Sequence, residues 1–172
     1  MFHPWAKEAP LYFIQFQQEI NEKFQEMSNQ ISANIAHEIQ QLRTQMKLTD
    51  VRILNEQART YNRSCLRALS EHVLHDSAFE FRILAKDRPG LGEGVPGNFQ
   101  SLESPPSRPI GSTPPDHFPK NKHDLNTLTH GQINYLAKFY NLDFGITQDM
   151  ALNQRRARFS YFLAHSWNSI AE

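Results

Sequence analysis

Apolar residues recur every eleven positions along the first third of the chain. One row contains Ile20, Ile31, Leu42 and Ile53, and an interleaved row contains Phe13, Phe24, Ile35 and Met46. Eleven residues complete three turns at about 3.67 residues per turn, close to the natural helical period of about 3.6. Both rows therefore stay on one side of a single long helix, and these eight residues are called the apolar stripe below. A helix with such a stripe needs a surface to pack against.

A seven-residue repeat describes the same segment less well. Steps of seven from Ile20 pass Met27 and reach the polar Asn34, and steps from Phe24 reach Glu38 after one further apolar residue. The eleven-residue rows hold for four members each. We therefore expect a nearly straight or weakly right-handed supercoil rather than a left-handed heptad coiled coil.

The limits of this helix follow from its proline and glycine content. Pro10 suits a helix start, and no further proline or glycine occurs before Pro89 and Gly90. The pattern predicts helix over about 11–69, which would be roughly 85–90 Å long at 1.5 Å per residue. The stripe itself ends at Ile53, so the seam for self-association is placed at residues 13–53.

Charge changes sign along the predicted helix. Acidic residues such as Glu19, Glu22 and Glu26 come early, whereas Arg43 and Lys47 begin a basic stretch. This order complements the helix dipole. It also favours antiparallel pairing, in which the acidic part of one chain meets the basic part of another.

The remainder divides by composition. Residues 1–10 form a tail, 70–88 a short helix or strand element, 89–123 a Pro/Gly-rich linker or strap, and 124–172 a C-terminal helical pair. Alternation in 79–83 predicts a short strand. The strap region is marked by eight of the ten prolines and five of the seven glycines, which fall in 89–119. The expected fold class is mainly α, with a long coiled-coil helix and a small helical domain.

Local capping signals divide the C-terminal pair. Thr129 and Gln132 form a capping-box pattern for one helix, and Thr147 is expected to cap the next. Residues 141–145 are typical of a turn, with Leu142 and Phe144 directed inward.

Overall composition narrows the function classes. The 172 residues have a formal net charge of zero, which gives no steering toward nucleic acid or anionic membrane. Cys65 is the single cysteine, and no secretory pattern or apolar run of about 20 residues is present. We expect an intracellular protein, in cytoplasm or nucleus, without a membrane span.

Four sequence features resemble functional motifs, and each has a simpler interpretation. Residues 92–97 match G-x-G-x-x-G, but prolines and serines follow where a dinucleotide site needs a helix. His72, His75 and Asp76 would share a helix face without enough further ligands for a metal. Cys65 has no evident catalytic base, and PxxP at 106–109 is common in proline-rich linkers. We expect no catalytic, cofactor-binding or metal-binding residues.

An alternative function is a small nucleic-acid-binding factor that uses basic helices. Its phosphate contacts would come from two groups of arginines. These are Arg59, Arg63 and Arg67 on the long helix and Arg155, Arg156 and Arg158 on the last helix. Such residues are more often solvated, or lie over a core.

Short motifs in roughly residues 58–165 resemble a known family. They are ARTYNRS (58–64), PPDHFP (114–119), LNTLT (125–129), FYNL (139–142), Arg155-Arg156 and FLA (162–164). The pattern is similar to the C-terminal domain of the fungal meiotically up-regulated gene (Mug-type) protein family. This resemblance implies a fungal, intracellular protein with a role in meiosis or sporulation, and it implies no catalytic residues.

Together these patterns predict a non-enzymatic protein for coiled-coil oligomerisation and protein interaction. It would form a homo-oligomer through residues 13–53 and bind a protein partner that the sequence does not identify.

Overall fold

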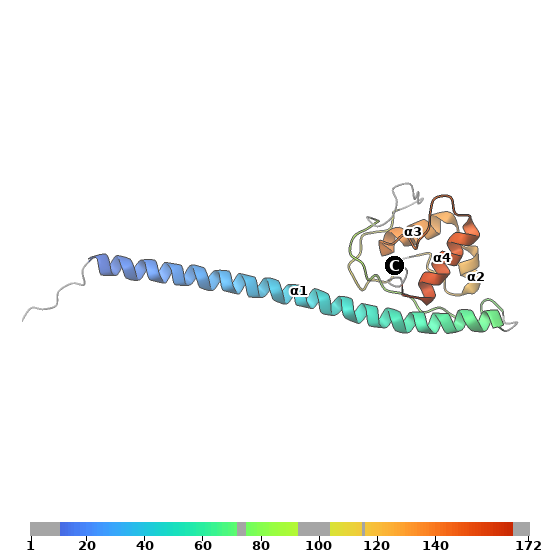
Figure 1. Ribbon diagram of the computed structural model, residues 1–172, viewed down its shortest axis with the longest axis horizontal. Helices are drawn as coiled ribbons and strands as arrows, with labels where there is room; N and C mark the ends of the chain where they lie inside the picture. The colour runs from blue at the N-terminus through green and yellow to red at the C-terminus, as the bar shows by residue number, and fades with distance from the viewer. Residues whose placement is uncertain (1–10, 72–74, 93–103, 115, 167–172) are drawn as a thin grey trace, which may run out of the picture. The chain divides into compact units, whose positions relative to one another are not determined.

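The computed structural model describes residues 11–71, 75–92, 104–114 and 116–166, and these residues are mainly α-helical, as predicted (Figure 1). The helices are α1 (Leu11–Glu71), α2 (Lys122–Thr127), α3 (His130–Tyr140) and α4 (Leu152–Ala164). The chain divides into two compact units, Met1–Gln45 and Met46–Glu172. α1 contributes to both, and each unit is described by itself.

The described part of the first unit is a single stretch of helix, residues 11–45 of α1. It contains neither proline nor glycine, so no residue interrupts the helical hydrogen bonds. Within this unit no second described element is available to cover an apolar side.

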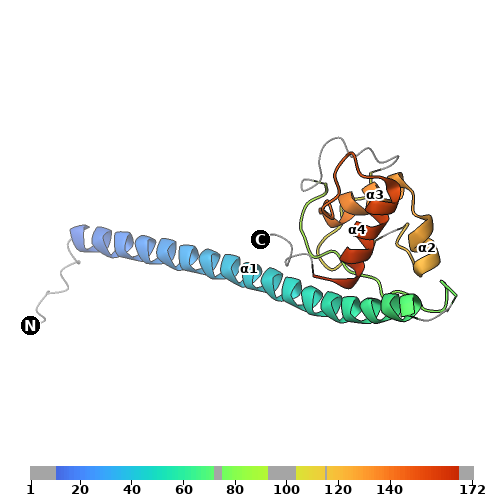
Figure 2. The same ribbon diagram turned by 45° about the vertical axis from the view of Figure 1, so that its right-hand side comes forward.

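The second unit contains the remainder of α1, the three short helices and the segments that join them. Figure 2 shows the short helices gathered beside the C-terminal part of α1. The face that α1 buries here comprises Val51, Asn55, Ala58, Asn62, Cys65 and Leu69. Their spacing alternates between four and three residues, which keeps them on one side of the helix.

Two asparagines on this face, Asn55 and Asn62, bind the main chain of the segment around Arg82 and Ala85, which is called the extended segment below. The Asn55 amide donates to Ala85 O and accepts from Ala85 N, both at 2.8 Å. Asn62 does the same with Arg82, at 3.0 and 2.7 Å. Seven residues of helix rise about 10.5 Å and three extended residues span about 10 Å, so the two pairings match in register.

The predicted strand at 79–83 is therefore wrong. The segment is extended, but no strand is assigned in the described residues. Part of its hydrogen bonding is satisfied by asparagine side chains instead of a neighbouring strand.

The proline-rich strap is hydrogen-bonded to the same segment. Main-chain bonds join Phe81 N to Lys120 O, Lys86 N to Ser112 O, and Gly111 N to Lys86 O. Gly111 has φ +89°, and a Cβ there would lie 3.2 Å from the Lys47 side chain. The positive φ favours glycine at this position, and a side chain there would also have to displace the end of the Lys47 side chain. The strap ends where α2 begins at Lys122, slightly earlier than predicted.

The capping prediction is confirmed for α3 and wrong for α4. Thr129 and Gln132 form the reciprocal capping box at the start of α3. α4 begins after Ala151, whereas the Thr147 hydroxyl donates to Asp149 in the preceding turn. Residues 147–150 instead form a turn that is closed by a bond from Met150 N to Thr147 O, so the helix begins four residues later than a cap at Thr147 would place it.

Aromatic rings fill the core between α3 and α4. Leu142 and Phe144 are buried as predicted. The ring of Phe144 lies 4.6 Å from that of Phe162 and 5.0 Å from that of Phe159, centroid to centroid. Tyr140 contacts Phe162 at 5.0 Å. These tilted and edge-on pairs add to the stabilisation from burial.

Replacing Asn62 with Ala tests the pairing of α1 with the extended segment. We expect the free energy of unfolding to fall by about 2–3 kcal/mol, because the main-chain groups of Arg82 and the Leu163 carbonyl lose their hydrogen-bond partner. Chemical denaturation would measure it. Asn153→Ala, at an exposed position of α4, is the control and should change stability by less than about 0.5 kcal/mol. Equal effects of the two variants would contradict the assigned role of Asn62.

Candidate functional site: the apolar stripe and an arginine-lined pocket

The structure leaves every residue of the apolar stripe exposed. In the first unit the exposed fractions are 47% for Phe13, 49% for Ile20, 66% for Phe24, 50% for Ile31, 52% for Ile35 and 58% for Leu42. In the second unit Met46 is 67% and Ile53 54% exposed. Contiguous apolar surface of this kind is typical of interaction sites.

The stripe is wider than the eight predicted residues. Phe16, Met27 and Ile39 are also large, apolar and at least 45% exposed on α1. At about 100° per residue they lie within a quarter turn or less of Ile31. Counting only eleven-residue steps missed them, although the flanking positions of a helical face were readable from the sequence.

Two arginines proposed for nucleic-acid contact instead hold the end of α4. Three successive carbonyls of its last turn accept bonds from α1. The pairs are Arg59 Nε to Phe162 O at 3.4 Å, Asn62 Nδ2 to Leu163 O at 3.3 Å, and Arg63 Nε to Ala164 O at 3.0 Å. Positive charge at a helix C-terminus also interacts favourably with the helix dipole.

The arginines of α4 are engaged in a similar way. Arg155 is buried and donates to three carbonyls in residues 147–150 and to the Asn134 side chain. Arg156 Nε donates to Leu128 O, just beyond α2, at 2.8 Å. Arg67 is exposed and paired with Glu71 at 2.6 Å, and Arg158 is exposed. Four of the six candidate arginines thus bind main-chain oxygens inside the domain.

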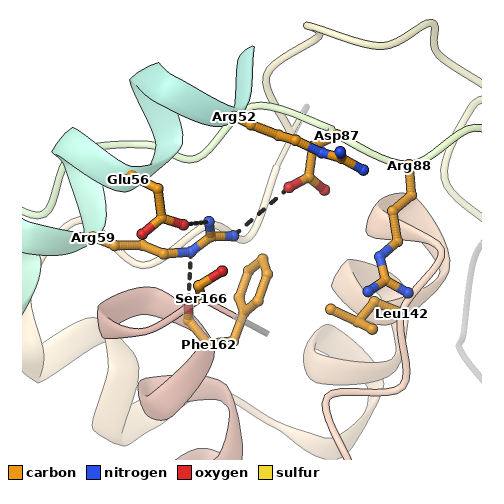
Figure 3. Close-up of a pocket in the computed structure, with 8 residues that line it drawn as sticks. All are labelled: Arg52, Glu56, Arg59, Asp87, Arg88, Leu142, Phe162 and Ser166. Atoms are coloured by element: carbon orange, nitrogen blue, oxygen red, sulfur yellow. Dashed lines mark hydrogen bonds and ion pairs between the residues drawn. The ribbon is translucent and has the colours of Figure 1, made fainter. Parts of the chain in front are cut away.

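A pocket of about 290 Å³ lies beside α1 in the second unit (Figure 3). It is lined by Arg52, Glu56, Arg59, Asp87, Arg88, Leu142, Phe162 and Ser166. α1 supplies Arg52, Glu56 and Arg59, and the segment before the strap supplies Asp87 and Arg88. The remaining three residues come from the loop after α3, from α4 and from the residues just after α4. Sequence reasoning did not identify this pocket, because its members are spread along the chain from Arg52 to Ser166.

Lys86 is a buried cation that directly precedes Asp87 and Arg88, two residues that line the pocket. Its side chain is 0% exposed, and its Nζ donates to Gly90 O at 2.6 Å and to Phe139 O near the end of α3. The ammonium also lies 5.2 Å from the centroid of the Phe139 ring. These carbonyl and ring contacts offset the cost of removing the charge from water.

The remaining chemical candidates gain no support from their positions. Cys65 is a free, buried thiol. His75 contacts Ser77, whereas His72 lies outside the described residues. Within the part of the chain that the structure describes, no group of three or more His, Cys, Asp or Glu could hold a metal. Residues 93–97 of the G-x-G-x-x-G match also lie outside it.

Comparison with known proteins adds no relative. No protein-family model, curated protein or solved structure matches the chain. The resemblance to the Mug-type family therefore stays a prediction. Among the described residues, no helix combines the length and apolarity needed to cross a bilayer.

Tyr140 gives a pH-dependent test of the core around the pocket. Burial raises the pKa of the Tyr140 hydroxyl well above its usual value, and Asp87 raises it further while Arg59 opposes this. Above about pH 10 the unfolded tyrosine ionises while the folded one keeps its proton, so stability should fall as pH rises.

Tyr140→Phe should remove the loss of stability that ionisation of Tyr140 causes above about pH 10. At pH 8 the variant should be less stable by about 1 kcal/mol, because the hydroxyl bond to Leu84 O is lost. The difference in free energy of unfolding between the wild type and Tyr140→Phe should narrow from about pH 10 upward, as measured by denaturant titrations. Tyr12→Phe, at a ring 70% exposed, is the control. A difference that stays constant with pH would refute the assignment.

Proposed function

We propose that this chain is a non-enzymatic protein that self-associates through the apolar stripe and presents its C-terminal unit to a protein partner. The observation that supports this most directly is the exposure of the stripe residues between Phe13 and Leu42, which lie on the part of α1 that has no second described element within its unit. A second copy offers a surface of the same pattern.

The apolar area of the stripe supports association. Full burial of a large apolar side chain contributes about 1.5–3 kcal/mol, so a half-exposed one would gain roughly 1 kcal/mol. Two copies of the eight-residue stripe would together gain roughly 16 kcal/mol. This is of the same order as the roughly 4–15 kcal/mol that the loss of translational and rotational freedom costs; ordering of side chains adds to the cost, and burial of Phe16, Met27 and Ile39 adds to the gain.

The cellular part of the proposal rests on the sequence. A role in fungal meiosis or sporulation comes only from the Mug-type resemblance, and an intracellular location comes from composition. Nucleic-acid binding is not retained as a second function, since Arg59, Arg63, Arg155 and Arg156 bind main-chain carbonyls.

Charged substitutions in the stripe should dissociate the assembly. Ile31→Asp with Ile35→Asp places two carboxylates in the seam, and we expect at least about a hundred-fold weaker association. Sedimentation velocity of the full chain at micromolar concentration would measure it. The matched control is Ala33→Asp with Gln40→Asp, which adds the same charge at exposed positions about half a turn away on α1. A wild-type chain that sediments as a monomer would refute the proposal.

Orientation can be tested by moving charges. In an antiparallel pair, Glu19→Lys, Glu22→Lys and Glu26→Lys together should weaken association at low salt, since the acidic part of one helix becomes basic and lies along the basic part of its partner near Arg43 and Lys47. These side chains lie about 120–180° around α1 from Ile31, so the effect acts over a long range and should disappear at high salt. Adding Arg43→Glu and Lys47→Glu should restore it. In a parallel pair like charges already face each other, so the triple variant would associate about as well as wild type.

A further inference from the structure

The pocket beside α1 has an excess of positive charge. Its lining includes three guanidinium groups, from Arg52, Arg59 and Arg88, and two carboxylates, from Glu56 and Asp87. The formal sum of three positive and two negative charges is +1. One monoanionic group would neutralise the site.

Arg59 already has partners within the protein. It is 3% exposed and pairs with Glu56 at 2.7 Å and with Asp87 at 3.8 Å. Its Nε donates to the Phe162 carbonyl, and its guanidinium lies 5.4 Å from the centroid of the Phe162 ring. Arg59 is therefore held at the side of the pocket, where it pairs with the carboxylates of Glu56 and Asp87.

Arg52 and Arg88 differ from Arg59 in this respect. Among the described residues, neither makes a hydrogen bond or an ion pair, although both line the same pocket. They come from different elements, α1 and the segment that follows Asp87, and Figure 3 shows both side chains at the pocket. Guanidinium groups match carboxylates geometrically, with two parallel N–H donors for two oxygens.

The rest of the lining is largely apolar and the space is small. Leu142 and Phe162 are buried residues whose side chains border the pocket. A volume of about 290 Å³ is at the lower end of the roughly 300–1,000 Å³ typical of ligand sites. It suits a group about the size of one amino-acid side chain or a small aromatic acid.

We propose that this pocket binds a carboxylate that has an adjoining apolar group. The carboxylate lies between Arg52 and Arg88, and the apolar part packs on Phe162 and Leu142. The source is either a small organic acid or an acidic residue beside an apolar one in a partner protein. None of the lining residues belongs to the apolar stripe, so this site and self-association can fail independently.

The test uses the full chain and fluorine NMR with 3-(4-fluorophenyl)propanoate as the probe. Saturable binding is expected, and the corresponding neutral amide should bind at least about ten-fold more weakly because it lacks the charge. Arg52→Gln with Arg88→Gln should weaken acid binding by at least about ten-fold. Equal binding of acid and amide, or acid binding unchanged in this double variant, would overturn the proposal.

A matched control removes two positive charges elsewhere. Arg67→Gln with Arg158→Gln changes net charge equally at exposed positions that do not line the pocket, and should leave acid binding within about two-fold of wild type. Thermal unfolding of each variant would verify that it is folded. Equal weakening by the two double variants would mean a general charge effect and would overturn the proposal.

A second probe distinguishes the two sources. An acetylated, amidated dipeptide of 4-fluorophenylalanine and glutamate has its carboxylate only on the side chain. Arginine-dependent binding of the dipeptide in preference to the free acid assigns the site to a protein partner, and the reverse preference assigns it to a small acid. No arginine-dependent binding of either probe, or displacement by inorganic phosphate at lower concentration than by the acid, would refute the proposal.

Discussion

The second unit depends on one kind of interaction, in which buried side-chain N–H groups donate to main-chain carbonyls of distant elements. Asn55 and Asn62 join α1 to the extended segment, and Asn62 also reaches the end of α4. Lys86 does the same with the Phe139 carbonyl of α3, and Arg155 joins α4 to the Asn134 side chain of α3. An unpaired buried carbonyl costs as much as a lost hydrogen bond, so these few donors determine which elements can pack together.

Short helices explain why such donors are needed. Each helix leaves its last four carbonyls without intrahelical partners, whatever its length. α2, α3 and α4 have 6, 11 and 13 residues, so a large share of their carbonyls lies at ends. Arg59, Arg63 and Arg156 cover these ends or the residue just beyond them. Four of the six arginines that resemble a nucleic-acid surface in sequence, Arg59, Arg63, Arg155 and Arg156, therefore stabilise the domain itself.

The helix α1 has two different faces, which separates folding from the proposed association. Within the second unit, Asn55, Ala58 and Asn62 belong to a buried face with three- and four-residue spacing. Ile53 and Met46 lie off that face and are exposed. A substitution in the stripe can thus alter assembly without removing a core contact. The pocket at Arg52 and Arg88 adds a third surface, which is lined by both charged and apolar side chains.

Local signals were enough to predict the mainly helical class, the extent of α1, and the capping box of Thr129 and Gln132, because each depends on residues within a few turns of one another. Two predictions failed. At 79–83 the main chain pairs with the Asn62 side chain and with Lys120 rather than with a strand, and Thr147 lies in a turn that precedes α4. The pairing of Asn62 with Arg82 and Leu163, and the pocket between Arg52 and Phe162, were decided only by the tertiary structure. Those partners are 20 to 110 residues apart in the chain, and no periodic pattern encodes which donor will face which carbonyl after folding.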